Sequence, residues 1–258
     1  MGYKQFTKSI MFFTLVNTMG YGLEIANVSQ AVDIAGKQRM FTQRMLKDYA
    51  MIGMKNTFGK PDEDLITTIK SFDDATNALL SYGKSDALKQ SIEKMNTLWT
   101  PLKKTLQSTA TVDNVAKLQE DLEVLLKVAD ETTKLFEKES GSAGGKIVNI
   151  SGRQRMLSQR MASLYMLKVW GVDDPEFKKK MDQSMDLFKT SLVKLEKSEL
   201  NTEEINQYLK KVKRSYMFFE MMNKSKSKFV PTLIYKKSDD ILKNMNSATQ
   251  AYVALEIK

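Results

Sequence analysis

The chain has 258 residues, neither Cys nor His, and a formal net charge of +9 from 40 Lys and Arg against 31 Asp and Glu. The absence of thiols and imidazoles excludes Cys/His zinc sites, catalytic cysteines and histidine general bases, so we expect no enzyme, metal site or cofactor. The lysines are interleaved with acidic residues along the chain, which favours a solvated basic surface over a nucleic-acid-binding one.

Residues 1–26 are predicted to be a cleaved signal peptide that directs export to the periplasm. Lys4 and Lys8 precede a short apolar stretch, and small residues follow as far as Ala26. Glu24 spoils the usual cleavage pattern, which leaves an uncleaved anchor as the alternative. No later segment is apolar enough to cross a bilayer.

Residues 27–140 are predicted to form a first domain of four helices. Breaks at 59–61 and 83–85, which contain Gly or Pro, and at 109–113 separate the helical stretches, and Pro101 is expected to kink the third. The predicted helices are 27–56, 62–82, 85–108 and 112–139.

Residues 141–258 are predicted to form a second domain, which also has four helices. It begins with a flexible Gly-rich linker at 141–145, and Asp174 with Pro175 is expected to cap the second of these helices. The predicted helices are 146–170, 174–198, 202–226 and 230–257.

An eleven-residue string at 35–45 recurs at 151–161, 116 positions later. The two copies read AGKQRMFTQRM and SGRQRMLSQRM, so Gly, both Arg, both Met and both Gln are identical. Two helices that needed only similar cores would agree in apolar residues and drift elsewhere. The retained polar residues therefore indicate a duplicated module.

Helices of about 25 residues joined by short loops are typical of up-down bundles. The predicted fold class is therefore all-α, with two tandem four-helix bundles related by a pseudo-two-fold axis. A tight reversal at 141–145 makes the first helices of the two bundles parallel, so that the two motifs lie at the same height.

The motif arginines Arg39 and Arg155 fall on the helix face that packs in such a bundle. Burying a guanidinium without a partner costs several kcal/mol, and neither motif contains an acid. A small oxyanion shared by the two arginines would resolve this, because guanidinium is a planar, multiple donor. The competing interpretation is a structural seam whose arginines bind carboxylates from elsewhere in the chain.

The other motif residues are predicted to form ion pairs, to surround the anion site or to pack in the core. Arg44 and Arg160 lie about 140° further round the helix, so ion pairs with neighbouring helices or solvent are expected for them. The surroundings of the anion site are predicted to include Met40, Met156, Gln43 and Gln159. The 17 Met residues are scattered at core spacing, which favours packing over copper binding.

The motif resembles the P box of the PilJ-type sensor domain, named from type IV pili methyl-accepting chemotaxis transducers and similar to the periplasmic nitrate/nitrite-sensing domains of NarX and NarQ. The resemblance implies a dimerising four-helix bundle with one nitrate held between paired first helices. Carried over by motif position, it names Arg39, Gly36, Arg155 and Gly152 as ligand-binding residues. Some members have Lys two residues before the motif Gly, where this chain has Ile34 and Ile150.

Together these observations predict a periplasmic sensor that binds nitrate or nitrite between the two motif helices. The sequence ends at Lys258 without a kinase or methyl-accepting segment, so a membrane sensor kinase or chemoreceptor is expected as its partner in signal transduction or chemotaxis. Two alternatives stay open. The motifs pair between chains of a homodimer rather than inside a monomer, or the protein is a structural envelope scaffold without a small ligand.

Overall fold

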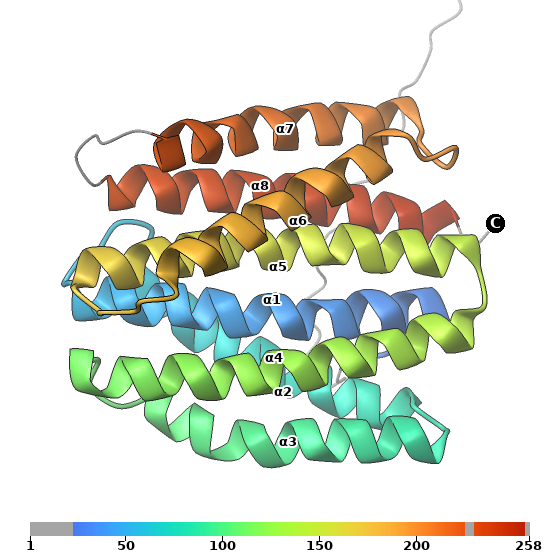
Figure 1. The fold of residues 1–258 in the computed structure, drawn as a ribbon. Helices are drawn as coiled ribbons and strands as arrows, with labels where there is room; N and C mark the ends of the chain where they lie inside the picture. Colours follow the sequence, from blue (N-terminus) through green and yellow to red (C-terminus); the bar gives the residue numbers. More distant parts are fainter. Residues whose placement is uncertain (1–22, 225–229, 256–258) are drawn as a thin grey trace, which may run out of the picture.

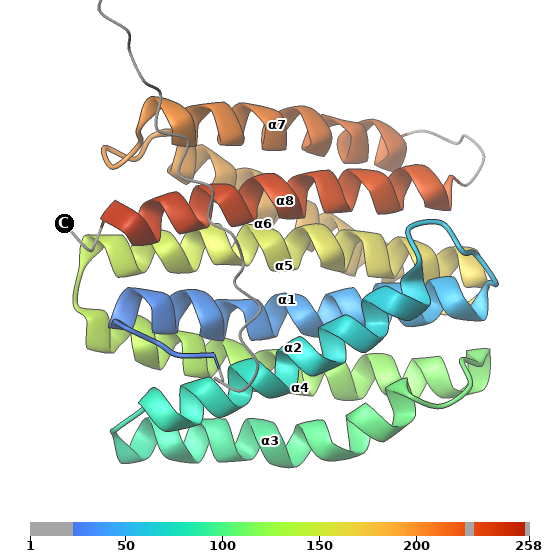
Figure 2. The ribbon, with the colours of Figure 1, turned by 180° about the vertical axis from the view of Figure 1, so that it is seen from behind.

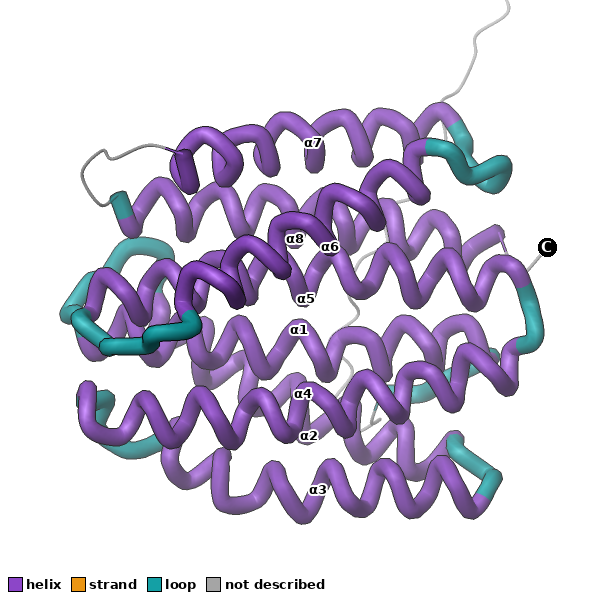
Figure 3. Tube along the Cα trace, viewed as in Figure 1, coloured by secondary structure: helices purple, strands orange, loops and turns teal. Residues whose placement is uncertain are grey.

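A computed structural model describes residues 23–224 and 230–255 of the chain. In these residues it contains eight helices and no strand, which confirms the predicted all-α class (Figures 1 and 3). The helices are α1 (Val28–Gly53), α2 (Pro61–Tyr82), α3 (Asp86–Leu106), α4 (Val112–Ser140), α5 (Ala143–Trp170), α6 (Phe177–Glu196), α7 (Glu203–Lys224) and α8 (Pro231–Leu255).

Side-chain caps define the beginning of several helices. Asn27, Ser85 and Thr111 each accept a hydrogen bond from the backbone N–H three residues later, at the start of α1, α3 and α4. α3 continues through Pro101, and Figure 2 shows its C-terminal part bending away from the line of its first turns.

Two predicted helix starts were wrong. α5 begins at Ala143 rather than 146, because the hydroxyl of Ser142 caps the helix by accepting from the N–H of Gly145. The Gly-rich linker is thus mostly helical. α6 begins at Phe177 rather than 174, since the Asp174 carboxylate accepts from the N–H of Glu176 and holds a separate turn before the helix.

The eight helices stack in two groups around a central pair. α1 packs on α2 and α4, and α4 packs on α3; α5, α6, α7 and α8 repeat this arrangement. α1 and α5 make the most extensive contact of all and lie in the middle of the stack, running parallel (Figures 1 and 2). One hydrophobic core runs through both groups. The domain boundary between 140 and 141 stays a prediction.

The ends of α1 and α5 approach closely at Gly53. A Cβ added to this glycine would lie 1.9 Å from Cζ2 of Trp170, the last residue of α5. Gly53→Ala is therefore expected to lower the free energy of unfolding by about 1–3 kcal/mol, as overpacking does. Urea denaturation measures this change. Adding Trp170→Leu should recover part of the loss, and a Gly53→Ala variant as stable as the wild type would contradict the close contact.

No helix in the described part of the chain is long and apolar enough to span a bilayer. Most of the predicted signal peptide, residues 1–22, lies outside the described residues. Ile25 is buried, and α1 begins at Val28, next to the predicted end of the leader.

Candidate functional site

The two motif arginines meet where α1 and α5 cross the centre of the molecule. Arg39 and Arg155 are both fully buried. An Nη2 atom from each arginine lies within 3.5 Å of the position that a Cβ would take on Gly36, and the same holds for Gly152. Larger residues at these glycines would displace the guanidinium groups. The structure thus brings the four predicted ligand-binding residues together within one chain.

Each buried arginine already has a carboxylate partner in the fold. Arg39 donates from Nη1 to Oδ1 of Asp130 on α4 at 2.5 Å. Nη2 of Arg155 lies 2.7 Å from Oδ1 of Asp33 on α1. The premise that these guanidinium groups lack a protein partner was therefore wrong. Asp33 lies just outside the first motif, and Asp130 lies on α4, which carries no motif.

Backbone and amide oxygens complete the environment of the two arginines. Nη2 of Arg39 donates to the carbonyl of Asn149 at 3.4 Å, and Nη2 of Arg155 donates to the carbonyl of Asp33 at 3.3 Å. Nη1 of Arg155 donates to Oδ1 of Asn246 at 3.2 Å. Nε of neither arginine has a hydrogen-bond acceptor among residues 23–224 and 230–255. Each guanidinium therefore keeps an unused donor.

Burial and the surrounding charges shift the pKa values of this cluster. Burial lowers the pKa of Arg39 to about 10, opposed by Asp130 and assisted by the like charges of Arg153 and Arg155. Burial raises the pKa of Asp33, but Arg155 and Lys37 outweigh it and leave that pKa below its ordinary value. The carboxylates are therefore ionised at neutral pH.

A surface cavity of about 290 Å³ reaches the cluster between α4 and α5. Four basic and two acidic side chains border it, so its lining carries positive charge. The lining residues are Arg39, Leu126, Lys127, Asp130, Glu131, Lys134, Arg153 and Met156.

Among the residues predicted to surround the site, Met156 borders this cavity, whereas Met40 is buried in the hydrophobic core. Among the described residues, Gln43 and Gln159 form no hydrogen bond with the two arginines. Gln43 donates to Glu123 on α4, and Gln159 donates to the carbonyl of Ser238 on α8. Both glutamines therefore link the central helices to their outer neighbours.

The second arginine of each motif forms an ion pair, as expected. Nη2 of Arg44 lies 2.6 Å from Oδ2 of Asp64 on α2, and Nη1 of Arg160 lies 2.8 Å from Oε2 of Glu123 on α4. The pair of Arg160 joins α5 to a helix of the first half. These two arginines therefore stabilise helix packing.

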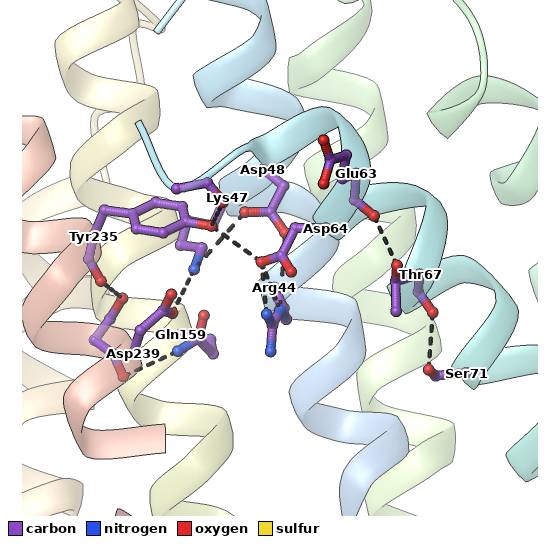
Figure 4. A network of polar contacts seen from close by, with 12 residues as sticks. Arg44, Lys47, Asp48, Glu63, Asp64, Thr67, Ser71, Gln159, Tyr235 and Asp239 are labelled. Atoms are coloured by element: carbon purple, nitrogen blue, oxygen red, sulfur yellow. Dashed lines mark hydrogen bonds and ion pairs between the residues drawn. The ribbon is translucent and has the colours of Figure 1, made fainter. Parts of the chain in front are cut away.

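A second buried polar cluster, not predicted from the sequence, lies one to two turns further along α1. Figure 4 shows Lys47 and Arg44 among the carboxylates of Asp48, Asp64 and Asp239. Nζ of Lys47 lies 2.8 Å from Oδ1 of Asp239 and 3.8 Å from Oδ1 of Asp48. In the aligned second copy, Ser163 and Leu164 stand at the places of Lys47 and Asp48, and this difference is a sequence signal that the first motif helix carries charges of its own.

Asp48 is fully buried, and neither of its carboxylate oxygens accepts a hydrogen bond from the residues that the structure describes. Burial raises its pKa to about 7, against the attraction of Lys47 and Arg44 and with the repulsion of Asp64 and Asp239. No group of three or more acids in the described part of the chain is arranged to hold a metal ion.

A family model described as the type IV pili methyl-accepting chemotaxis transducer N-terminal region, PilJ, matches residues 24–130 and 138–216. The two segments cover well over half of the chain and include both arginine motifs. No curated protein and no solved structure matches the chain significantly.

Proposed function

We propose a function on the premise that the chain belongs to the PilJ family of chemotaxis-transducer sensory domains. The protein is a periplasmic sensor of a small oxyanion, nitrate or nitrite. The anion binds between α1 and α5 at Arg39, Arg155, Gly36 and Gly152. Residues 1–26 export the protein, and a membrane chemoreceptor or sensor kinase reads the state of the site.

The observation that carries this proposal is the pairing of two fully buried arginines over two glycines. Like charges placed this close repel each other, and each guanidinium keeps a donor without an acceptor. A planar oxyanion matches guanidinium donors in shape and would reduce the repulsion. The cavity bordered by Arg39 and Arg153 offers such an anion a route from solvent.

Tandem duplication is the second part of the proposal, because it lets one chain supply both halves of the site. Contacts that recur at the same offset support it. Gln38 donates to the carbonyl of Phe72, and Gln154 donates to the carbonyl of Phe188. The rings of Phe72 and Trp99 pack at 4.3 Å between centroids, and those of Phe188 and Tyr216 pack at 4.6 Å after a slip of one residue in the offset.

Titration calorimetry with nitrate and nitrite, alongside thermal melting, tests the site. Arg39→Gln and Arg155→Gln are expected to abolish binding, because each removes half of the charge and the planar donors. In the wild type, anion at about a hundred times its dissociation constant should add about 2.7 kcal/mol of stability. Arg214→Gln on the exposed surface of α7 serves as the control and should bind normally.

Unchanged affinity in both site variants would refute the assignment. The carboxylate partners of the two arginines favour a second candidate, a structural helical protein of the cell envelope whose arginine pair serves packing alone. If no small oxyanion raises the melting temperature of the wild type, this scaffolding function replaces the sensor.

A further inference from the structure

The two motif arginines occupy equivalent places, yet their equivalent partners differ in charge. Arg39 binds the carboxylate of Asp130 at 2.5 Å, whereas Arg155 binds the amide oxygen of Asn246 at 3.2 Å. Asp130 and Asn246 are 116 positions apart, as the arginines are. The Nη1 donor of Arg39 is therefore held by a full negative charge and that of Arg155 by a neutral amide, while the carboxylate partner of Arg155, Asp33, lies at Nη2.

Asp130 is also the accessible member of its ion pair. Its side chain is 25% exposed, while that of Arg39 is fully buried. Oδ1 of Asp130 accepts from Arg39, and Oδ2 lies 2.7 Å from Nζ of Lys134 on the same helix. Both acid and arginine border the cavity between α4 and α5, together with Arg153. An anion that enters by this cavity meets Asp130 at Arg39.

We propose that Asp130 is an internal competitor that sets the affinity of the site for its anion. In the free protein its carboxylate occupies Nη1 of Arg39. A bound oxyanion takes over this donor, while Asp130 stays held by Lys134 and turns toward the basic side of the cavity. This inference rests on the proposed function, because it presumes that the arginines bind an oxyanion.

The physical reason is that a carboxylate and an oxyanion require the same guanidinium donor and repel each other when close. An amide in place of the carboxylate still accepts the hydrogen bond but brings no negative charge, as Asn246 does for Arg155. Removing a competing charge-assisted hydrogen bond should tighten anion binding about ten- to a hundredfold.

Two reciprocal substitutions test the inference by calorimetry with nitrate on the full chain. Asp130→Asn, which copies the second half, is expected to bind nitrate about ten- to a hundredfold more tightly than the wild type. Asn246→Asp, which copies the first half, is expected to bind it more weakly by a similar factor. Glu131→Gln is the matched control, because Glu131 borders the same cavity and is adjacent in sequence, whereas the ion pair of Arg39 is with Asp130.

The outcomes separate the inference from the proposed function. If the wild type binds nitrate and Asp130→Asn binds it equally well, or if Glu131→Gln tightens binding as much, the competitor role is overturned and the sensor function stands. If Asp130→Asn binds nitrate and the wild type does not, the result supports both the competitor role and the proposed function. If neither protein binds any of nitrate, nitrite and chloride while both melt cooperatively, the proposed function fails and the inference with it. If Asp130→Asn does not fold, the affinity of Asn246→Asp for nitrate decides. Weaker binding than in the wild type supports the competitor role, and unchanged binding overturns it.

Discussion

Lys47→Ala is expected to lower the free energy of unfolding by about 3–5 kcal/mol, the cost of removing one partner from a buried ion pair. The side chain of Lys47 is fully buried, and its ammonium group lies 3.8 Å from the ring centroid of Tyr235 as well as beside two carboxylates. Without it, Arg44, at 4.0 Å, is the remaining close cation of the fully buried Asp48 within the described ranges of the chain. Urea denaturation of both proteins measures the difference.

A second substitution shows whether the loss comes from the uncompensated acid. Asp48→Leu installs the residue that the second half has at the equivalent place, Leu164. At about pH 9, above the pKa of Asp48, Lys47→Ala should cost less in the Asp48→Leu background than in the wild type, since only Asp239 then loses its partner; at about pH 5, where Asp48 is protonated, the two costs should agree. Lys60→Ala, which removes an exposed lysine of a surface ion pair, is the control and should change stability by under about 1 kcal/mol. A loss below that limit for Lys47→Ala would contradict the buried cluster.

The free energy of unfolding is expected to fall as pH rises from about 4 to about 7. Asp48 has a pKa of about 7 in the fold against an ordinary value of 3.8, so between these values the folded chain binds a proton that the unfolded chain lacks. The stabilisation by protonated Asp48 is complete below pH 3.8 and is lost as pH rises through 7. The difference amounts to about 4 kcal/mol. Urea titrations at a series of pH values measure it.

The pH dependence between pH 4 and 7 is expected to come from Asp48. The chain has no His, which would otherwise titrate there. The ion-paired Asp33 and Asp130 have lowered pKa values, so their stabilisation is lost only as pH falls below about 4. Asp48→Leu should therefore flatten the stability profile between pH 4 and 7. A variant that keeps the slope of the wild type would assign the effect to another group.

Local signals in the sequence were sufficient to predict the helices. Capping residues and Pro at first turns lie where the helices begin, for example Asn27 and Pro61. The start of α5 was missed because Gly144 and Gly145 are poor helix formers in isolation. Burial of both glycines against neighbouring helices and the cap by Ser142 outweigh that preference.

The pairing of Arg39 with Arg155 was also predictable, since it follows from two identical motifs and one short reversal between α4 and α5. Their carboxylate partners were not. Asp130 lies 91 residues from Arg39, and Asp33 lies 122 residues from Arg155. Nothing in the local pattern distinguishes these acids from the many acids on exposed helix faces.

The sequence by itself determined the all-α class, the positions of the eight helices and the two arginines that meet at the centre. These features depend on periodicity, caps and a repeated string, all of which act over a few turns of helix. Only the tertiary structure decided which charges neutralise one another. Coulomb energy depends on distance and burial, and these are set by how α4 and α8 pack against α1 and α5. The ion pair of Arg39 with Asp130 and the cluster around Asp48 therefore appear only in the folded chain.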